Sequence, residues 1–233
     1  WSIKNTLDLK DDLYDKYNRK KYKIPIISSA VNFEHKEIPI DPYLLGLLIG
    51  DGCLHENSSI SISTNDEEII NYVSKEVIAK NLKVKRSGKY DYGLVSENNK
   101  NYLKEEFRNL NLLGTKSVDK FIPNLYKFNT IEIRLEVLRG LMDTDGWIGF
   151  QKSGKNKIQY YTSSKNLAED VKFIVETLGG VGNIIYKNNK GEIKINRRKA
   201  FRKNNYVVDI KLPENINPFK LSRKSNKYIR TSN

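Results

Sequence analysis

Two aspartates, Asp51 and Asp145, have the sequence surroundings that most strongly indicate chemistry. Each precedes a glycine at the end of an apolar segment, and the segments YLLGLLIGDGCL and VLRGLMDTDGWI place the two aspartates 94 residues apart. A single Asp-Gly pair is more typical of a turn than of a site. Its recurrence after two similar segments indicates an internal duplication with one carboxylate in each copy.

The two segments are predicted to be helices that pack against one another. Small residues fall four positions apart in each, at Gly46 and Gly50 and at Gly140 and Thr144. Residues four apart share one face of a helix, and faces of small residues allow two backbones to approach closely. We therefore expect the helices to cross there and to bring Asp51 and Asp145 close together.

Two neighbouring carboxylates repel one another, and one of them takes up a proton unless a cation lies between them. Carboxylate and backbone oxygens suit a hard divalent ion such as Mg²⁺ (or Mn²⁺), completed by water and substrate phosphate. We predict that Asp51 and Asp145 bind this ion, with Gly50 and Thr144 as further metal-binding positions. Such a centre suits phosphodiester hydrolysis, because it polarises a phosphoryl oxygen and activates water.

The charge of the chain suits a polyanionic partner. It carries 41 Lys and Arg against 28 Asp and Glu, a net charge of +13, and residues 187 to 230 hold fourteen basic and three acidic residues. A concentrated excess of this kind favours nucleic acid. The single cysteine excludes a disulfide framework and a cysteine-built zinc site, and the two histidines argue against a histidine-rich one. No stretch reaches the roughly 20 apolar residues that span a bilayer, so we expect an intracellular protein with no membrane partner.

The remaining pattern predicts the same order of elements in both halves. After each Asp-Gly helix come a strand, at SSISISTN or KIQYYTSS, and a helix, at DEEIINYVSKEVIAKNL or SKNLAEDVKFIVETLGG. A hairpin follows in each half, turning at residues 87–88 in the first and at residues 188–191 in the second, and KFIPNLY is predicted to be extended. We divide the chain into a lead-in, residues 1–40, and two repeats, residues 41–129 and 130–233.

The two Asp-Gly phrases resemble the paired signature of single-chain LAGLIDADG homing endonucleases, and the resemblance extends from about Pro42 to Tyr228. It implies an α+β fold in which two pseudo-symmetric αββαββα half-domains form a DNA-binding β-saddle. It also implies that the last acidic residue of each motif, Asp51 or Asp145, is the metal ligand. The earlier acidic position of the motif, which is not the usual ligand, is Ile49 in the first copy and Asp143 in the second.

Two further segments resemble intein-encoded members of this family. TKSVDKFIPNLY is similar to the segment after the first repeat, which implies a catalytic role for Lys120, and PFKLSRKSNKY to that after the second, which implies Lys224, with Arg223 as the alternative. Either lysine would stabilise phosphate charge or position the attacking water. Because residue 1 is Trp and the chain ends in Thr-Ser-Asn, we expect no self-splicing from this chain.

The saddle implies that alternate side chains of its strands face the major groove. The predicted DNA contacts are basic and aromatic residues: Lys83, Lys85, Lys89, Tyr90 and Tyr92 in the first repeat, and Lys152, Lys155, Lys157, Lys187, Lys194, Arg197, Arg198, Arg202 and Lys203 in the second. Arg197 and Arg198 would read guanine, and most of the lysines would contact phosphate. Their concentration in the second repeat predicts an asymmetric footprint.

The sequence therefore predicts a monomeric, Mg²⁺-dependent endonuclease that cuts both strands of double-stranded DNA at a long, specific site and needs no obligate protein partner. By resemblance, its products carry 3′ overhangs. One alternative is a LAGLIDADG nucleic-acid binder that does not cut, such as an RNA maturase or a transcription regulator, and another is an inactive remnant. The intact carboxylates at Asp51 and Asp145 argue against both alternatives.

Overall fold

The computed structural model describes residues 3–10, 12–22, 26–27, 29–96, 101–150, 156–188, 191–195, 198–202 and 205–228, with only the backbone of 191–195 and 198–202. Four predicted DNA contacts lie outside the described residues: Lys152, Lys155, Arg197 and Lys203. Of three more, Lys194, Arg198 and Arg202, only the backbone is described. Among the described residues, no helix combines the length and the apolar character needed to cross a membrane.

The first repeat follows the predicted αββαββα order. Its elements are α2 (Pro42–Asp51), β1 (Gly52–Cys53), β2 (Ser61–Ser63), α3 (Glu67–Ile78), β3 (Leu82–Arg86), β4 (Asp91–Ser96) and α4 (Tyr102–Asn109). The strands form one antiparallel sheet in the order β1-β2-β4-β3. The side chain of Asp41 accepts a hydrogen bond from the Leu44 N–H at 2.8 Å, which caps the start of α2.

The second repeat follows the same order with one insertion. Its elements are α6 (Ile131–Thr144), β5 (Gly146–Phe150), β6 (Asn156–Thr162), α7 (Lys165–Thr177), β7 (Val181–Lys187), β8 (Gly191–Ile195), β9 (Arg198–Arg202), β10 (Asn205–Lys211) and α8 (Ser222–Ser225). The main sheet has the order β5-β6-β10-β7, matching the first. The predicted α+β class with two duplicated halves is confirmed.

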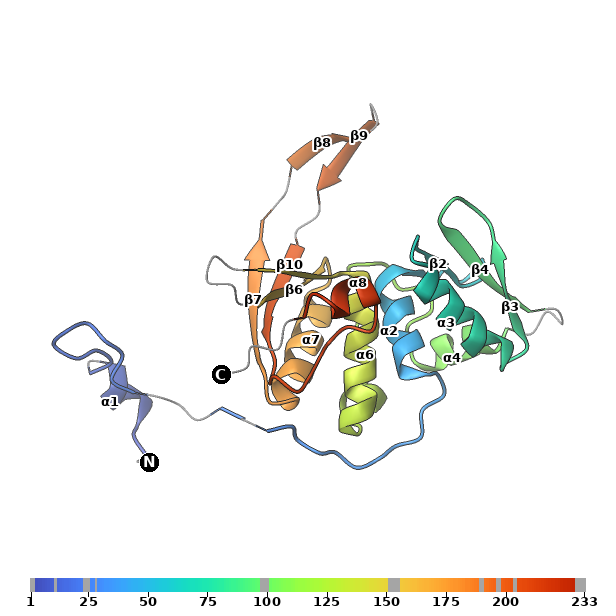
Figure 1. The fold of residues 1–233 in the computed structure, drawn as a ribbon. Helices are drawn as coiled ribbons and strands as arrows, with labels where there is room; N and C mark the ends of the chain where they lie inside the picture. Colours follow the sequence, from blue (N-terminus) through green and yellow to red (C-terminus); the bar gives the residue numbers. More distant parts are fainter. Residues whose placement is uncertain are drawn as a thin grey trace.

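Two local predictions were wrong. The predicted turn at residues 188–191 would pair β7 with β8, yet β7 pairs with β10, from Lys187 opposite Asn205 to Val181 opposite Lys211. This register buries Val208 and Ile210 of β10 against the core, while β8 and β9 form a separate hairpin that extends beyond the sheet (Figure 1). The predicted extended piece KFIPNLY instead contains a short helix, α5 (Asn124–Lys127), which starts after Pro123.

Helices α2 and α6 lie side by side at the centre of the molecule, with one sheet on each side (Figure 1). Their contact depends on glycine. A Cβ at Gly46 would lie 2.4 Å from the Val137 carbonyl oxygen, and one at Gly140 would lie 2.4 Å from that of Tyr43. Nearer the ends of the helices, a Cβ at Gly50 would collide with the Thr144 side chain. The predicted backbone-to-backbone crossing is therefore confirmed.

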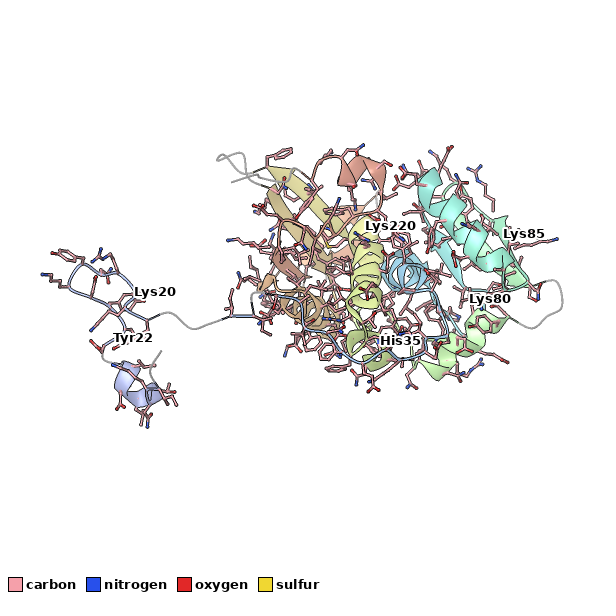
Figure 2. The ribbon with its side chains drawn as sticks, turned by 60° about the horizontal axis from the view of Figure 1, so that its bottom comes forward. Lys20, Tyr22, His35, Lys80, Lys85 and Lys220 are labelled. Carbon is pink, nitrogen blue, oxygen red and sulfur yellow. The ribbon has the colours of Figure 1, made fainter. Side chains whose placement is uncertain are left out.

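Residues 29–40 form an extended strap across both repeats, which Figure 2 shows passing α6 near the labelled His35. Buried Arg134 of α6 donates hydrogen bonds to the carbonyl oxygens of Val31, Asn129 and Thr177. At the other end, the Tyr126 hydroxyl bonds to both the N–H and the carbonyl of Ile40. The described residues before the strap include one short helix, α1 (Thr6–Lys10), and this helix lies apart from the repeats in Figure 1.

Candidate metal and nuclease site

Asp51 and Asp145 lie where the two central helices end. Asp51 is the last residue of α2, and Asp145 follows α6 with its N–H bonded to the Leu141 carbonyl at 3.0 Å. Because α2 and α6 remain in contact up to Gly50 and Thr144, the two aspartates that follow these residues lie at the same end of the helix pair. Both aspartates are exposed residues.

The electrostatics of the two carboxylates fit a cation site. Desolvation first, and then the charge of Asp51, raise the pKa of Asp145 to about 6, against the opposing charges of Lys120 and Lys224. Desolvation also raises the pKa of Asp51, against the same two lysines. A bound cation would reverse both shifts, because it favours the ionised carboxylates.

Lys120 is buried beside the end of α2, with 7% of its surface exposed. Its ammonium donates hydrogen bonds to the carbonyl oxygens of Gly50, at 3.0 Å, and Gly52, at 2.9 Å. These carbonyls flank Asp51 and belong to the negative end of the helix. Burial lowers the pKa of Lys120, while Asp145 and Asp51 raise it.

Lys224 occupies the matching place in the second repeat, with 6% of its surface exposed. Its ammonium donates to the carbonyl oxygens that flank Asp145, those of Thr144 at 3.3 Å and Gly146 at 2.7 Å, and to Met142 and Asp143 of α6. Burial, with a smaller effect of Arg223, lowers its pKa to about 8. This geometry favours Lys224 over Arg223 as the counterpart of Lys120.

Arg223 points elsewhere. It forms a bidentate ion pair with Asp66, with both nitrogen–oxygen distances at 2.8 Å. Asp66 is the residue that precedes α3 of the first repeat, so the segment that carries Lys224 is fastened to the opposite repeat. The Lys120 segment shows the same relation, because its Lys120 carbonyl accepts a hydrogen bond from Ser164, the residue that precedes α7.

Asp143 has a structural role in this arrangement. It is 1% exposed, and one carboxylate oxygen accepts hydrogen bonds from the Tyr43 hydroxyl and from the N–H groups of Lys220 and Leu221. These contacts hold the chain three residues before Lys224. The Lys220 ammonium lies over the Tyr43 ring at 4.4 Å, and Figure 2 shows Lys220 beside the central helices.

Two hollows meet at Lys120. One, of about 290 Å³, takes residues from both repeats and is lined among others by Gly50, Lys120, Asp145 and Tyr161. The other, of about 920 Å³, lies between residues 52–57 and 113–120. Lys120 and Ser117 line both hollows, so the positive charge of Lys120 would attract an anionic substrate that enters either one.

The carboxylates of Asp51 and Asp145 suit a Mg²⁺ ion whose coordination shell is completed by water and substrate oxygens. No cluster of three or more Asp, Glu, His or Cys side chains able to hold a metal occurs among the described residues. Two carboxylates with open positions are nevertheless the arrangement in which Mg²⁺ keeps waters and binds phosphate. The carbonyls of Gly50 and Thr144 already accept a lysine hydrogen bond each, so their metal binding, through a second lone pair, remains a prediction.

The outer face of the first sheet carries part of the predicted DNA-contact set. Lys83 and Lys85 are exposed on β3, with Lys85 pointing away from the body (Figure 2), and Lys89 and Tyr90 lie in the following turn. Tyr92 does not belong to this face. It pairs with Ile62 and Arg86 and packs against the core, because side chains alternate along β4. We therefore withdraw Tyr92 as a DNA contact.

Two of the predicted DNA contacts, Lys157 on β6 and Lys187 on β7, are exposed on the second sheet. Residues that were not predicted lie beside them. The Lys187 ammonium lies 5.9 Å from the centre of the Tyr161 ring, and the Tyr161 hydroxyl donates to Gln159 at 2.8 Å. Trp147, 45% exposed, stands opposite Gln159 on the neighbouring strand. The sequence signal that could have found these residues is the alternation of side chains along β5 and β6. Every second side chain lies on the same face as Lys157, whether it is a lysine, an aromatic residue or an amide.

Comparison with known proteins finds a family match in the second repeat. Residues 132–209 match the LAGLIDADG-like domain family. The match covers the second repeat from α6 to β10, including Asp145.

The chain is also similar to segments of curated proteins named as helicases. It is 31% identical to replicative DNA helicase DnaB of Synechocystis sp. over 149 residues, which are 58% of this chain and 17% of that protein. It is 28% identical to ATP-dependent DNA helicase Hel308 of Thermococcus kodakarensis over 155 residues, which are 60% of this chain and 13% of that protein. The chain thus spans about a sixth, or less, of the length of these relatives.

Solved structures with a similar course of the chain include two kinds of protein. A mesophilic variant of the homing endonuclease I-DmoI is 17% identical with a TM-score of 0.46, covering 82% of this chain and 92% of that one. I-DmoI in complex with DNA and Mn is 19% identical with a TM-score of 0.45, covering 74% and 89%. Full-length DUF199/WhiA from Thermatoga maritima is 12% identical with a TM-score of 0.44, covering 72% and 49%.

Proposed function

We propose that this chain is a Mg²⁺-dependent endonuclease that cuts both strands of double-stranded DNA at a long, specific site and leaves 3′ overhangs. The observation that carries the proposal is the duplicated site at the ends of α2 and α6. Each helix ends in an exposed aspartate, Asp51 or Asp145, and a buried lysine binds the carbonyls on either side of it. A protein that only binds nucleic acid has no need of this pairing of carboxylate and ammonium in both repeats.

The side chains divide the chemistry between them. Asp51 and Asp145 would hold the ion, which supplies activation of water and stabilisation of the leaving oxygen when bound. Lys120 and Lys224 place positive charge beside the carboxylates in a desolvated setting, where it stabilises the charge that develops on phosphate. Two such half-sites in one chain serve the two DNA strands without a second copy, so we propose a monomer.

The outer faces of the two sheets would hold the DNA. Lys83 and Lys85 on one sheet and Lys157 and Lys187 on the other give positive charge on both sides of the aspartates. The net charge of +13 suits a phosphate backbone. The β8–β9 hairpin, which the first repeat lacks, would lengthen the contact on the side of the second repeat.

We also propose that the chain derives from an intein-type endonuclease, as the segments around Lys120 and Lys224 suggest. The small fraction of the helicase-named relatives that it matches, 17% and 13%, supports an origin as an inserted module and gives no support for helicase activity in this chain.

Cleavage of a randomised double-stranded DNA library tests the proposal directly. Incubation with Mg²⁺ is expected to release fragments that share one long motif and end in 3′ overhangs. Selective retention of the same motif without a cut in Mg²⁺ or Mn²⁺ would instead establish a non-cleaving binder. Absence of both cleavage and selective retention would contradict DNA recognition altogether.

A further inference from the structure

Tyr160 is a buried polar residue for which the fold gives no reason. It lies in the middle of β6 with 0% of its surface exposed, and its hydroxyl has no hydrogen-bond partner among the described residues. Buried hydroxyls are normally satisfied, so one without a partner calls for an explanation. The other deeply buried tyrosines have one: Tyr43 bonds to Asp143, and Tyr126 bonds to Ile40.

The position of Tyr160 connects it to the candidate site. In the β5–β6 ladder it stands opposite Gly146, the residue after Asp145, and the next N–H along β6, that of Tyr161, donates to the Asp145 carbonyl at 3.3 Å. Burial raises the pKa of Tyr160 well above its usual range, and the charges of Asp145 and then Asp51 raise it further. The field of both carboxylates therefore reaches this hydroxyl.

The first repeat shows that packing alone does not require a hydroxyl there. The residue opposite Gly52, which follows Asp51, is Ile62, and it is also 0% exposed. Ile62 and Tyr160 are thus equivalent positions of the two repeats, one apolar and one with a polar atom beside the carboxylates. The duplicated site is asymmetric at this point, with the extra hydrogen-bond donor on the Asp145 side.

Resting on the proposed nuclease function, we propose that Tyr160 is a positioning residue for the Asp145 half-site. Its hydroxyl, which has no partner among the described residues, donates a hydrogen bond to a water that in turn donates to the Asp145 carboxylate, and this bridge holds the carboxylate in its metal-binding orientation. A donor behind a ligating carboxylate fixes the ligand and tunes its affinity for the ion. The Asp51 half-site, with Ile62 behind it, works without such a donor.

The test compares Tyr160→Phe with Tyr126→Phe, a matched removal of a buried hydroxyl away from the site. Cutting of each strand is followed on end-labelled target DNA, with Asp145→Asn used to assign the strand that Asp145 serves. Tyr160→Phe is expected to lower the rate of cutting of that strand about 10- to 100-fold, so that DNA nicked in the other strand accumulates. It should melt no lower than the wild type, because no group of the described residues loses a hydrogen-bond partner when this hydroxyl is removed. Tyr126→Phe, which loses two hydrogen bonds, should melt lower and leave the ratio of strand rates unchanged.

A second readout does not depend on cleavage. Titration of the protein with Mn²⁺ in a calorimeter is expected to show weaker binding for Tyr160→Phe and unchanged binding for Tyr126→Phe. If the wild type cuts no DNA, the proposed nuclease function fails and the Mn²⁺ comparison still judges Tyr160. Wild-type strand rates or wild-type Mn²⁺ affinity in Tyr160→Phe would overturn the proposal and leave a core tyrosine.

Discussion

Lys120 and Lys224 make the same contact in the two repeats: each ammonium binds the carbonyl oxygens immediately before and after an aspartate at the end of a central helix. Each lysine lies on a segment that is fastened to the N-terminal end of a helix in the opposite repeat, through Ser164 or Asp66. The two half-sites are therefore built by both repeats together.

Replacement of either lysine by methionine, Lys120→Met or Lys224→Met, should remove charge stabilisation and keep the buried volume. We expect double-strand cleavage to fall by about 10²- to 10³-fold, the effect typical of losing one preorganised donor. Single-turnover cleavage rates measure this loss. The matched control is Arg223→Met, which breaks the ion pair with Asp66 and takes no ammonium from the carbonyls. If Arg223→Met lost more of the cleavage rate than Lys224→Met, Arg223 and not Lys224 would be the counterpart of Lys120.

Metal binding should depend on pH through Asp145, whose pKa is raised to about 6. Below pH 6 the ion must displace a proton, so its apparent affinity should fall about tenfold per pH unit. Between about pH 4 and 6 the folded chain binds this proton more tightly than the unfolded chain does, so the contribution of Asp145 to the free energy of unfolding falls as pH rises. Calorimetric Mn²⁺ titration at pH 5 and pH 7 checks the affinity, and equal values at the two pH values would contradict the assignment.

The contact between α2 and α6 at Gly46 and Gly140 should tolerate no added side chain. In Gly46→Ala the added Cβ would lie 2.4 Å from the Val137 carbonyl oxygen, so the helices must move apart. We expect the free energy of unfolding to fall by about 1–3 kcal/mol, as in other overpacked cores. Gly93→Ala is the control, since its Cβ would lie no closer than 3.7 Å to any neighbour. Equal denaturant midpoints for the two variants would mean that the helices do not cross as described.

The basic residues between positions 197 and 203 should contribute to DNA binding. We expect weaker DNA binding when alanine replaces Arg197, Arg198, Arg202 and Lys203. The slope of log affinity against log salt concentration should become shallower by about 0.9 for each phosphate contact that is lost. Binding measured at several salt concentrations gives this slope. The control is Lys165→Ala with Lys172→Ala, which removes two charges from the surface of α7. An unaltered slope in the fourfold variant would place these four residues outside the interface.

The parts of the fold that could be predicted are those with a repeated signal. The phrases around Asp51 and Asp145, with matched small residues, indicated the helix pair, its crossing and the carboxylates at its end. Tyr92 was misassigned because a single hairpin pattern does not say which face of β4 is covered by helices. The partner of β7 was misassigned because a local turn signal competed with the burial of Val208 and Ile210, which only the whole sheet determines.

Other features depend on tertiary contacts that leave no mark in the sequence. Arg134 looks like any helix-surface arginine, yet it is buried and binds the strap at Val31. Lys224 and Arg223 are neighbours of similar charge, and only their different partners separate them. Tyr160 is one of fourteen tyrosines, and its significance comes from the absence of a bonding partner beside Asp145 among the described residues.

The measurement that tests the central claim most directly is cleavage of the target DNA by Asp51→Asn and Asp145→Asn, beside binding of the same DNA. Both substitutions keep size and remove the charge that would hold the ion. Each variant is expected to bind the target with nearly wild-type affinity and to make no double-strand cut in Mg²⁺. Double-strand cleavage at the wild-type rate by either variant would contradict the account.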